Sequence, residues 1–545
     1  MAPSVAARRL APSLLIPCGG KLLPPPQQTL PHIFAARSCA PSSACTKGRR
    51  FCRSKSDWRK PLPGAAFPLC GRPAQLVVAL ARRRRATQED RPARGSAALL
   101  GHLPFALSCL VWLVLAVIIS YAVRLDYGPD EPAHMEYVHL LAREGRLPEP
   151  WDSTAGHHGP VPYLLLVPFY RLSGCTLEPL RLPPGPKRLA TFTAEEVRAR
   201  RVLRLVCLFE AFLAVVCIYY FAVRLFPQSR PLALLLSGAV AFNPVYTLTA
   251  GVVNNEQASI VLSTVASGLM LLAWREGELS WRRCLALGAL CGLGLWVKQT
   301  TIFLLPLALF SAWRLSPPER RVRHVLCLLG LFLALGVWWP LHHVLKGRGP
   351  FPVFMPVPEW QDNRVIYWIT HPMLTLAVVH TIATTSLLSA ILPDWAFRGP
   401  FQLLTRSHFG LLVFALLCLV ALGYALYATQ AERRKKPPRD QPLIPRHAIA
   451  LGLAALCIII AGIVWFALRR DYRGQVGGRY LFNGALWGAL IAVGSFERWV
   501  LTFARTRRAV DFAALAAWAL FIALDAVWVW YAVTYYRALA VLYGG

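Results

Sequence analysis

The sequence predicts an all-α integral membrane protein with about eleven transmembrane helices. Hydrophobic residues make up 56% of its 545 residues and charged residues only 16%, whereas soluble domains carry roughly 25% charged residues. The apolar residues gather in repeated runs of about 20, the length that a helix needs to cross a bilayer. Backbone polar groups cannot stay unpaired in lipid, so long apolar runs without alternation are expected to be helices.

The basic residues between the apolar runs give the predicted topology. With the N-terminus in the cytoplasm, five short basic connections, 227–230, 275–282, 316–322, 429–447 and 498–509, fall on the cytoplasmic side, as the positive-inside rule requires. The outer face then carries two long loops, 124–201 and 344–408. The predicted spans lie near 103–123, 202–226, 231–250, 254–274, 283–297, 300–315, 323–343, 409–428, 448–468, 480–497 and 510–536.

Residues 1–100 differ from the membrane domain expected at 101–545, because they are rich in Pro, Ser, Arg and Cys and have few acids. Three interpretations compete for this extension. It is a disordered basic cytoplasmic tail, translated sequence upstream of the true start, or a transit peptide. None of the three predicts a folded domain.

The net charge of +32 does not indicate a nucleic-acid-binding protein. The cations stand beside the apolar runs or in the first hundred residues, where topology and targeting place them. No nucleic-acid motif is present. Most of the 14 cysteines lie inside apolar runs, where they are typical of small buried side chains rather than of a disulfide framework or zinc site.

An acidic segment follows the first span and contains Asp130, Glu131 and His134. Pro132 suits the first turn of a helix, so the two acids are expected at its N-terminus with His134 about one turn later. This arrangement suits a general base that faces the outer side. The alternative is an acidic helix cap with a hydrogen-bonded histidine at the membrane interface.

Three further groups of polar residues lie on the predicted outer face. His157 and His158 precede an apolar run that is expected to be an interfacial helix. Asn254 and Asn255 open a span, either as caps or as the lining of an outer cavity. Lys298 stands between two apolar runs, either as a snorkelling residue or as a phosphate ligand.

A loop near the end of the chain places four arginines on the predicted outer side, against the positive-inside bias. It contains Arg473, Arg479 and Tyr480 beside a pair of glycines. A guanidinium cluster in a flexible loop is a good receptor for phosphate. A solvated loop is the alternative.

The ordered set of motifs resembles the GT-C membrane glycosyltransferases, and more narrowly the bacterial branch related to protein O-mannosyltransferases and to the aminoarabinose transferases of lipid A. The resemblance covers roughly residues 103–500. A second family of uncharacterised bacterial membrane proteins shares the first and last of the motifs. Those that carry the resemblance are DEPAHMEYVHLLAREGRLP, HHGPVPYLLLVPFYRL, RVLRLVCLFEAF, VNNEQA, KQTTIFLLPLAL and GGRYLF.

The resemblance implies a many-helix fold whose first outer loop forms the active face. It implies a polyprenyl-phosphate sugar donor and a lipid, glycan or protein acceptor at the outer face of a plasma membrane of the bacterial inner type. By carry-over, Asp130 would be the essential acid, Glu131 its neighbour in the paired-acid motif, and Lys298 and Arg479 the phosphate ligands. Some relatives use a divalent metal, for which Asp130, Glu131 and His134 could supply ligands.

The chain departs from the family pattern in two places, and both bear on the identity of the acceptor more than on the fold. A second aspartate is often found where this chain has Asn254, Asn255 and Glu256, and the N-terminal extension has no counterpart.

Two other functions stay open. A transporter or flippase would show two-fold hydropathy symmetry and mid-membrane charges; no symmetry is visible, although Glu210 and Asp525 are such charges. A non-catalytic scaffold would keep the same motifs.

Overall fold

The computed structural model divides the chain into two units, Met1–Asp90 and Arg91–Gly545, and all the residues that it describes lie in the second. The predicted N-terminal extension and the predicted span 409–428 therefore fall outside the described residues. The described residues are 101–125, 128, 130–149, 152–153, 155–174, 192–347, 350, 442–470, 478–504 and 506–542.

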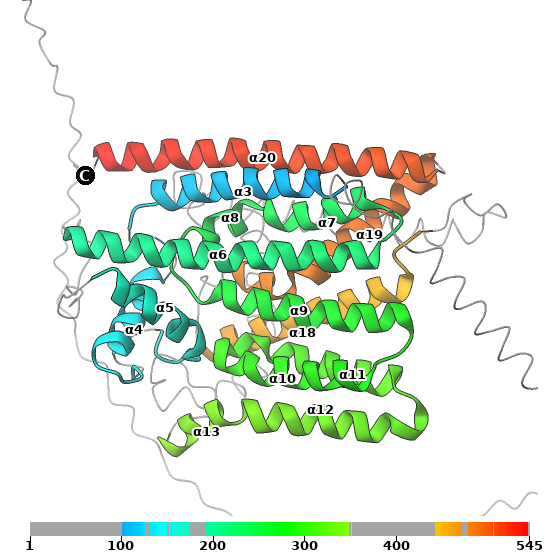
Figure 1. Cartoon of the computed structure of the whole chain (residues 1–545), viewed down its shortest axis with the longest axis horizontal. Helices are drawn as coiled ribbons and strands as arrows, with labels where there is room; N and C mark the ends of the chain where they lie inside the picture. Colours follow the sequence, from blue (N-terminus) through cyan, green and yellow to red (C-terminus); the bar gives the residue numbers. More distant parts are fainter. Residues whose placement is uncertain are drawn as a thin grey trace, which may run out of the picture. The chain divides into compact units, whose positions relative to one another are not determined.

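Every described element is a helix, which agrees with the predicted fold class. Labels follow Figure 1. In chain order the helices are α3 (Leu103–Ala122), α4 (Glu131–Arg143), α5 (Val161–Leu172), α6 (Ala194–Leu225), α7 (Arg230–Ala241), α8 (Pro244–Ala250), α9 (Glu256–Glu276), α10 (Trp281–Val297), η1 (Gln299–Phe303), α11 (Leu304–Leu315), η2 (Pro318–Arg320), α12 (Arg321–Gly336), α13 (Trp338–Leu345), α18 (Arg446–Arg470), η6 (Gly478–Gly484), α19 (Ala485–Ala504) and α20 (Arg507–Leu542).

Each predicted span that falls on described residues coincides with one of these helices or with a pair of them, but the number of eleven membrane crossings is not confirmed. By length and apolarity, α3, α6, α9 and α20 can each cross a bilayer alone. Two bent pairs raise this number to six if each pair is one span: α7 with α8, bent by 61°, and α12 with α13, bent by 46°. The described helices α10 and α11 are shorter, with 17 and 12 residues.

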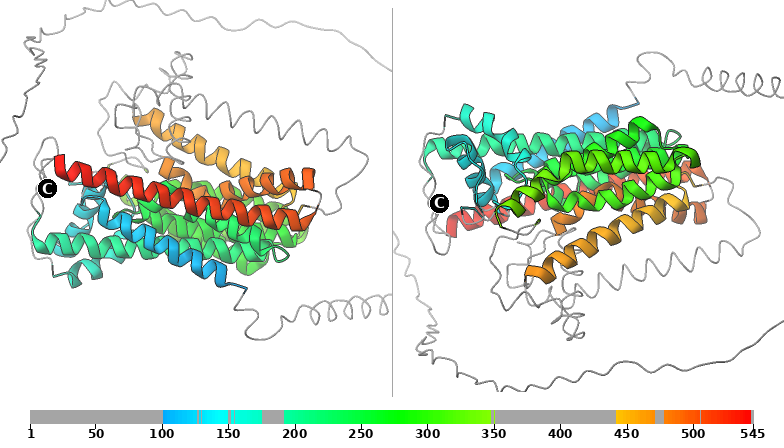
Figure 2. Two further views of the ribbon diagram at one scale, coloured as in Figure 1. Left: turned by 90° about the horizontal axis from the view of Figure 1, so that it is seen from above. Right: turned by 90° about the horizontal axis from the view of Figure 1, so that it is seen from below.

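The long helices lie side by side (Figures 1 and 2), and the core forms where they meet. Helix α6 packs against α7 and α9, α20 packs along α3 and α7, and α10 pairs with α12. Trp112, Tyr246 and Trp487 are among the largest fully buried side chains of this core. The buried seams hold the bundle together by shape-complementary packing.

The outward faces of α3 and α20 are apolar over most of their length. Leu110 is 59% exposed and Ile118 41% on α3, and Leu524 and Val527 are more than half exposed on α20. Continuous exposed apolar surface of this extent is not stable in water, and it is what a bilayer covers. The protein is therefore a membrane protein.

Two short helices, α4 and α5, pack together at the end of the bundle where α6 begins (Figure 1). Tyr137 of α4, Tyr163 of α5 and Leu203 of α6 form a small buried cluster with Val253, which precedes α9. The other face of α5 is apolar and exposed, with Leu165 52% and Leu172 81% accessible, as predicted for an interfacial helix. This cluster fixes the acidic segment to the bundle.

Candidate functional site

The two acids of the first motif point into different surroundings. Asp130 is the N-cap of α4 and is exposed, whereas Glu131, the first residue of the helix, has no accessible surface. Asp130 has φ = 58°, and it is the only non-glycine residue with a positive φ in the described part of the chain. This left-handed conformation turns the chain sharply, so that neighbouring carboxylates separate.

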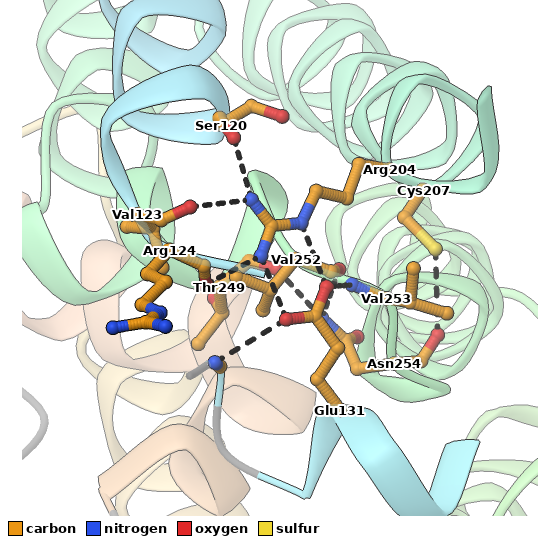
Figure 3. Close-up of polar contacts among 11 residues, drawn as sticks. Ser120, Val123, Arg124, Glu131, Arg204, Cys207, Thr249, Val252, Val253 and Asn254 are labelled. Atoms are coloured by element: carbon orange, nitrogen blue, oxygen red, sulfur yellow. Dashed lines mark hydrogen bonds and ion pairs between the residues drawn. The ribbon is translucent and has the colours of Figure 1, made fainter. Parts of the chain in front are cut away.

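Glu131 forms a buried, two-pronged ion pair with Arg204 of α6 (Figure 3). Arg204 Nε lies 2.7 Å from Glu131 Oε1, and Nη2 lies 2.7 Å from Oε2. The backbone N–H groups of Val253 and Gly128 also donate to these oxygens, at 3.1 and 3.3 Å. Both carboxylate oxygens are thus engaged, which leaves Glu131 little capacity to take a proton from a substrate.

Arg204 also closes the end of α3. Its Nη1 donates to the carbonyl oxygens of Ser120 and Val123 at 2.6 and 2.7 Å, and its Nη2 donates to that of Arg124 at 3.0 Å (Figure 3). These carbonyls belong to the last turn of α3 and to the two residues after it, where helical donors are missing. The guanidinium therefore joins the end of α3 to the start of α4, and Glu131 extends this connection to the segment before α9 through the Val253 N–H.

Sequence inspection missed Arg204, although it lies inside a quoted motif. The available signal was an arginine near the start of an otherwise apolar span, which needs a buried partner or an interfacial position. Its carboxylate partner lies 73 residues away, and no local pattern connects the two.

The histidines predicted in the first loop come together around two tyrosines. His134 Nδ1 is 2.8 Å from Tyr163 Oη, and its ring centroid lies 6.0 Å from that of His158. His157 and His158 have ring centroids 3.9 Å apart, and Tyr137 Oη donates to the carbonyl of His158. Loop and helix are thereby held in one aromatic stack beside Asp130.

The segment before α9 is built by Asn254. Its Nδ2 donates to the carbonyls of Thr249 and Val252 at 2.6 and 2.9 Å, and its Oδ1 accepts from the Glu256 N–H at 2.8 Å. Asn254 thus stabilises the turn before α9, whereas the N-cap residue of the helix is Asn255, whose side chain makes no capping hydrogen bond. The turn presents the Val253 N–H to Glu131 and places Asn255 at the N-terminus of α9.

Lys298, at the end of α10, is 2% exposed and forms an ion pair with Glu256, which is 3% exposed. The pair stands at the first turn of α9. Burial, followed by electrostatic interactions with Tyr137, Glu256 and Asp130, raises the pKa of Tyr163 well above its usual value.

Asn255 is buried yet lacks polar partners in the described part of the chain. It is 1% exposed, and neither its Oδ1 nor its Nδ2 forms a hydrogen bond with a described residue. Gln257 Oε1 is also buried without a hydrogen-bond partner among the described residues. Buried amide groups are almost always hydrogen-bonded, so unused donors and acceptors beside a helix N-terminus and a lysine indicate a place for a polar ligand.

The arginine-rich loop lies mostly outside the described residues. Arg473 falls outside them, and Arg479 and Tyr480 are described only as part of η6. Helix η6 contacts α9 and η1, and Asn483 at its end bonds to Ser259 and Thr300 at 2.7 and 3.0 Å. Helix η6 is thus tied to α9, which carries the ion-pair partner of Lys298, and to η1, which follows Lys298 in the chain.

Glu136 of α4 is a half-buried acid with a perturbed protonation equilibrium. Burial, and secondarily the charge of Asp152, raises its pKa to about 7, against a lowering contribution from a hydrogen bond with Ser153.

Within the described ranges, no group of three or more His, Cys, Asp and Glu side chains stands close enough to hold a metal ion.

Comparison with known proteins gives one family match. Residues 190–342 match the family described as dolichyl-phosphate-mannose-protein mannosyltransferase. Arg204, Asn254, Asn255 and Lys298 lie inside the matched segment, and Asp130 precedes it. No curated protein matches the chain.

Among solved structures, the chain is similar to the crystal structure of ArnT from Cupriavidus metallidurans in the apo state. The identity is 18% over 74% of this chain and 78% of that chain, with a TM-score of 0.34. The family match confirms, over residues 190–342, the resemblance to the membrane mannosyltransferases of the GT-C class that the sequence motifs indicate.

Proposed function

We propose that the protein is a membrane glycosyltransferase that moves a sugar from a polyprenyl-phosphate donor to a hydroxyl or amine of a lipid, glycan or protein acceptor on the outer face of a plasma membrane, with the N-terminus in the cytoplasm. The observation that carries the proposal is the placement of Asp130. Asp130 is exposed as the N-cap of α4, at the turn that the buried Glu131–Arg204 ion pair fixes to the bundle.

Asp130 is the proposed general base. The acceptor oxygen or nitrogen attacks the anomeric carbon, the bond from that carbon to the phosphate oxygen breaks, and the polyprenyl phosphate leaves with the electron pair. The acceptor proton passes to Asp130. Glu131 takes a positioning role, because its oxygens are engaged by Arg204 and by two backbone N–H groups.

Lys298 and Asn255 are the proposed phosphate ligands. The Lys298 ammonium stabilises the charge that develops on the leaving phosphate, and the Asn255 amide N–H groups supply neutral donors. Arg473, Arg479 and Tyr480 are proposed to bind the donor, and the contacts of η6 with α9 and η1 support this for positions 479 and 480. His134, His157 and His158 are proposed to contact the sugar or the acceptor.

The test is sugar transfer in membranes that express the protein, with radiolabelled polyprenyl-phosphate sugars as donors. Wild type is compared with Asp130→Asn and with a control, Glu144→Gln, which removes an exposed acid at the other end of α4. Transfer by wild type and by the control, with a loss of at least about 100-fold in Asp130→Asn, supports the proposal.

Transfer that survives in Asp130→Asn removes this carboxylate from the base role. Absence of transfer from every polyprenyl-phosphate donor, in wild-type protein shown to be folded, argues against the glycosyltransferase function.

A further inference from the structure

The span predicted at 231–250 is broken inside the bundle. Helix α7 ends at Ala241 and α8 begins at Pro244, with an angle of 61° between them. Asn243 makes the break, because its Oδ1 accepts from the N–H groups of Val245 and Tyr246 at 2.9 and 3.4 Å. Such a break frees carbonyl groups at the end of α7, and within a membrane they need polar partners from neighbouring helices.

Asp525 of α20 stands at this break. Helix α20 packs against α7 and α8, and both Asp525 and Thr247 of α8 have no accessible surface. Thr247 Oγ1 lies 2.9 Å from Asp525 Oδ2 and 3.2 Å from the carbonyl oxygen of Ala241. Within the described residues no cation is paired with this carboxyl group, and its Oδ1 has no hydrogen-bond partner.

The number of hydrogen atoms available for these two contacts determines the protonation state of Asp525. The Thr247 hydroxyl has one hydrogen to donate, while a carboxylate and a carbonyl can only accept. Both short contacts become hydrogen bonds only when Asp525 is protonated. Its O–H then donates to Thr247 Oγ1, and the Thr247 O–H donates to Ala241. A neutral carboxyl group also avoids burying an unpaired charge in an apolar interior.

Helix α8 leads directly into the candidate site. The Thr249 carbonyl accepts from Asn254 Nδ2 at 2.6 Å, and the Val253 N–H donates to Glu131 Oε1 at 3.1 Å. A shift of α8 therefore moves the amide that supports Glu131, and with it the turn that carries Asp130.

We propose that Asp525, as a neutral carboxylic acid, is a positioning residue that holds α8 against the end of α7. In this way it keeps the Val253 N–H in position to donate to Glu131. Its effect on sugar transfer rests on the proposed function, but its effect on α8 does not. An intramembrane acid in this role moves no proton or ion, in contrast to those of transporters.

The first test needs no substrate. Hydrogen–deuterium exchange is followed by mass spectrometry in peptides covering 244–257, with the full-length protein in detergent. Asp525→Leu and Thr247→Val are expected to speed exchange there by at least about tenfold, because both remove the hydrogen bond that holds α8 to α20. Asp525→Asn is expected to stay within about twofold, because its Nδ2–H donates to Thr247 in place of the carboxyl O–H.

Val510→Ala is the matched control, since Val510 is buried on the same helix near its other end. It is expected to lower thermal stability without faster exchange in 244–257. Unchanged exchange in Asp525→Leu, or equal acceleration in Asp525→Asn, overturns the proposal. Thr247→Val removes the same hydrogen bond from the side of α8, so it decides the matter if Asp525→Leu does not fold.

The second test measures kcat for sugar transfer in the same variants. Asp525→Leu is expected to lower kcat by about 10- to 100-fold, because misplacement of a catalytic group by about 1 Å has effects of this size, while Asp525→Asn retains activity. If wild type transfers sugar and Asp525→Leu matches it, the inference is wrong. If exchange behaves as expected and wild type transfers nothing, the proposed function fails and the positioning role stands.

Discussion

Glu131 and Arg204 are joined through both carboxylate oxygens, although 73 residues separate them and neither has accessible surface. A planar guanidinium fork matches a carboxylate in a way that a lysine ammonium does not. The pair connects α4 to α6, while Asp130 beside it stays exposed.

The first prediction concerns this pair. Arg204→Lys keeps the charge, but one ammonium cannot make the five hydrogen bonds of the guanidinium and leaves buried acceptors unpaired. It is therefore expected to lower the free energy of unfolding by about 1–3 kcal/mol and to reduce transfer more than the loss of folded protein explains. Arg201→Lys, a change in an exposed arginine that stacks on Tyr121, is the control with little expected effect. Thermal unfolding and transfer in detergent check both, and equal behaviour of the two variants contradicts the assignment.

The second prediction concerns Lys298 and Glu256. Lys298→Met leaves Glu256 buried without its cation and is expected to be strongly destabilising. The double variant Lys298→Met/Glu256→Gln removes both charges and should recover most of that stability. It should still raise the donor KM by about 10- to 100-fold, which corresponds to a lost hydrogen bond from a charged group.

The comparison of the single and double variants distinguishes two roles of Lys298, as the ion-pair partner of Glu256 alone or also as a ligand of the donor phosphate. A double variant with the wild-type donor KM would show that Lys298 serves only to neutralise Glu256.

The third prediction concerns the two neighbouring asparagines. Asn255→Leu is expected to leave stability unchanged or to raise it slightly, because the side chain has no polar partner among the described residues and an apolar group of similar size suits a buried site. Donor binding should weaken. Asn254→Leu, the matched control, should destabilise the protein by about 1–3 kcal/mol, because it breaks three hydrogen bonds of the turn.

Donor binding and thermal stability are measured for both asparagine variants. Loss of stability in Asn255→Leu comparable to that in Asn254→Leu would show that Asn255 is part of the scaffold rather than of the donor site.

The fourth prediction is a pH dependence at Glu136. Its pKa is raised from 4.5 to about 7, so its contribution to stability is fully present below about pH 4.5 and is lost as the pH rises through 7. Glu136→Gln should match wild type at low pH and exceed it above pH 7. The expected difference is about 1 kcal/mol, because solvent screens this half-exposed group.

The check on Glu136 is thermal unfolding between pH 4 and 8. Asp152→Asn removes the second cause of the raised pKa, so it should move the wild-type loss of stability to a lower pH range. A difference between Glu136→Gln and wild type that does not vary with pH rules out the titration of Glu136 as the cause.

The helices were predictable from the sequence, and the breaks within them were not. Apolar runs predict the positions of α3, α6, α9 and α20, because the bilayer imposes length and composition on a span. The bend after α7 follows from Asn243 and Pro244, which an apolar run of normal length conceals. The span expected from residue 480 begins as the 3₁₀ helix η6, and α19 starts only at Ala485.

The candidate site was predictable where its chemistry is contiguous. Asp130 and Glu131 stood out as acids after a span, and Lys298 as a cation between two apolar runs. The partners did not stand out, because tertiary packing decides that Glu131 meets Arg204 and Lys298 meets Glu256. The same packing places the side chain of Asn254 in the hydrogen bonds of the turn. It leaves the side chain of Asn255 without a hydrogen bond to a described residue.

The left-handed conformation of Asp130 restricts what can replace it. With φ at 58°, position 130 favours glycine, asparagine and aspartate, whose side chains tolerate that region of backbone space. Glutamate would place its carboxylate one methylene further on and would strain the turn, so longer acids are not equivalent to aspartate here. Under the proposed general-base role, backbone geometry and proton transfer act as two separate requirements at this position, and aspartate satisfies both.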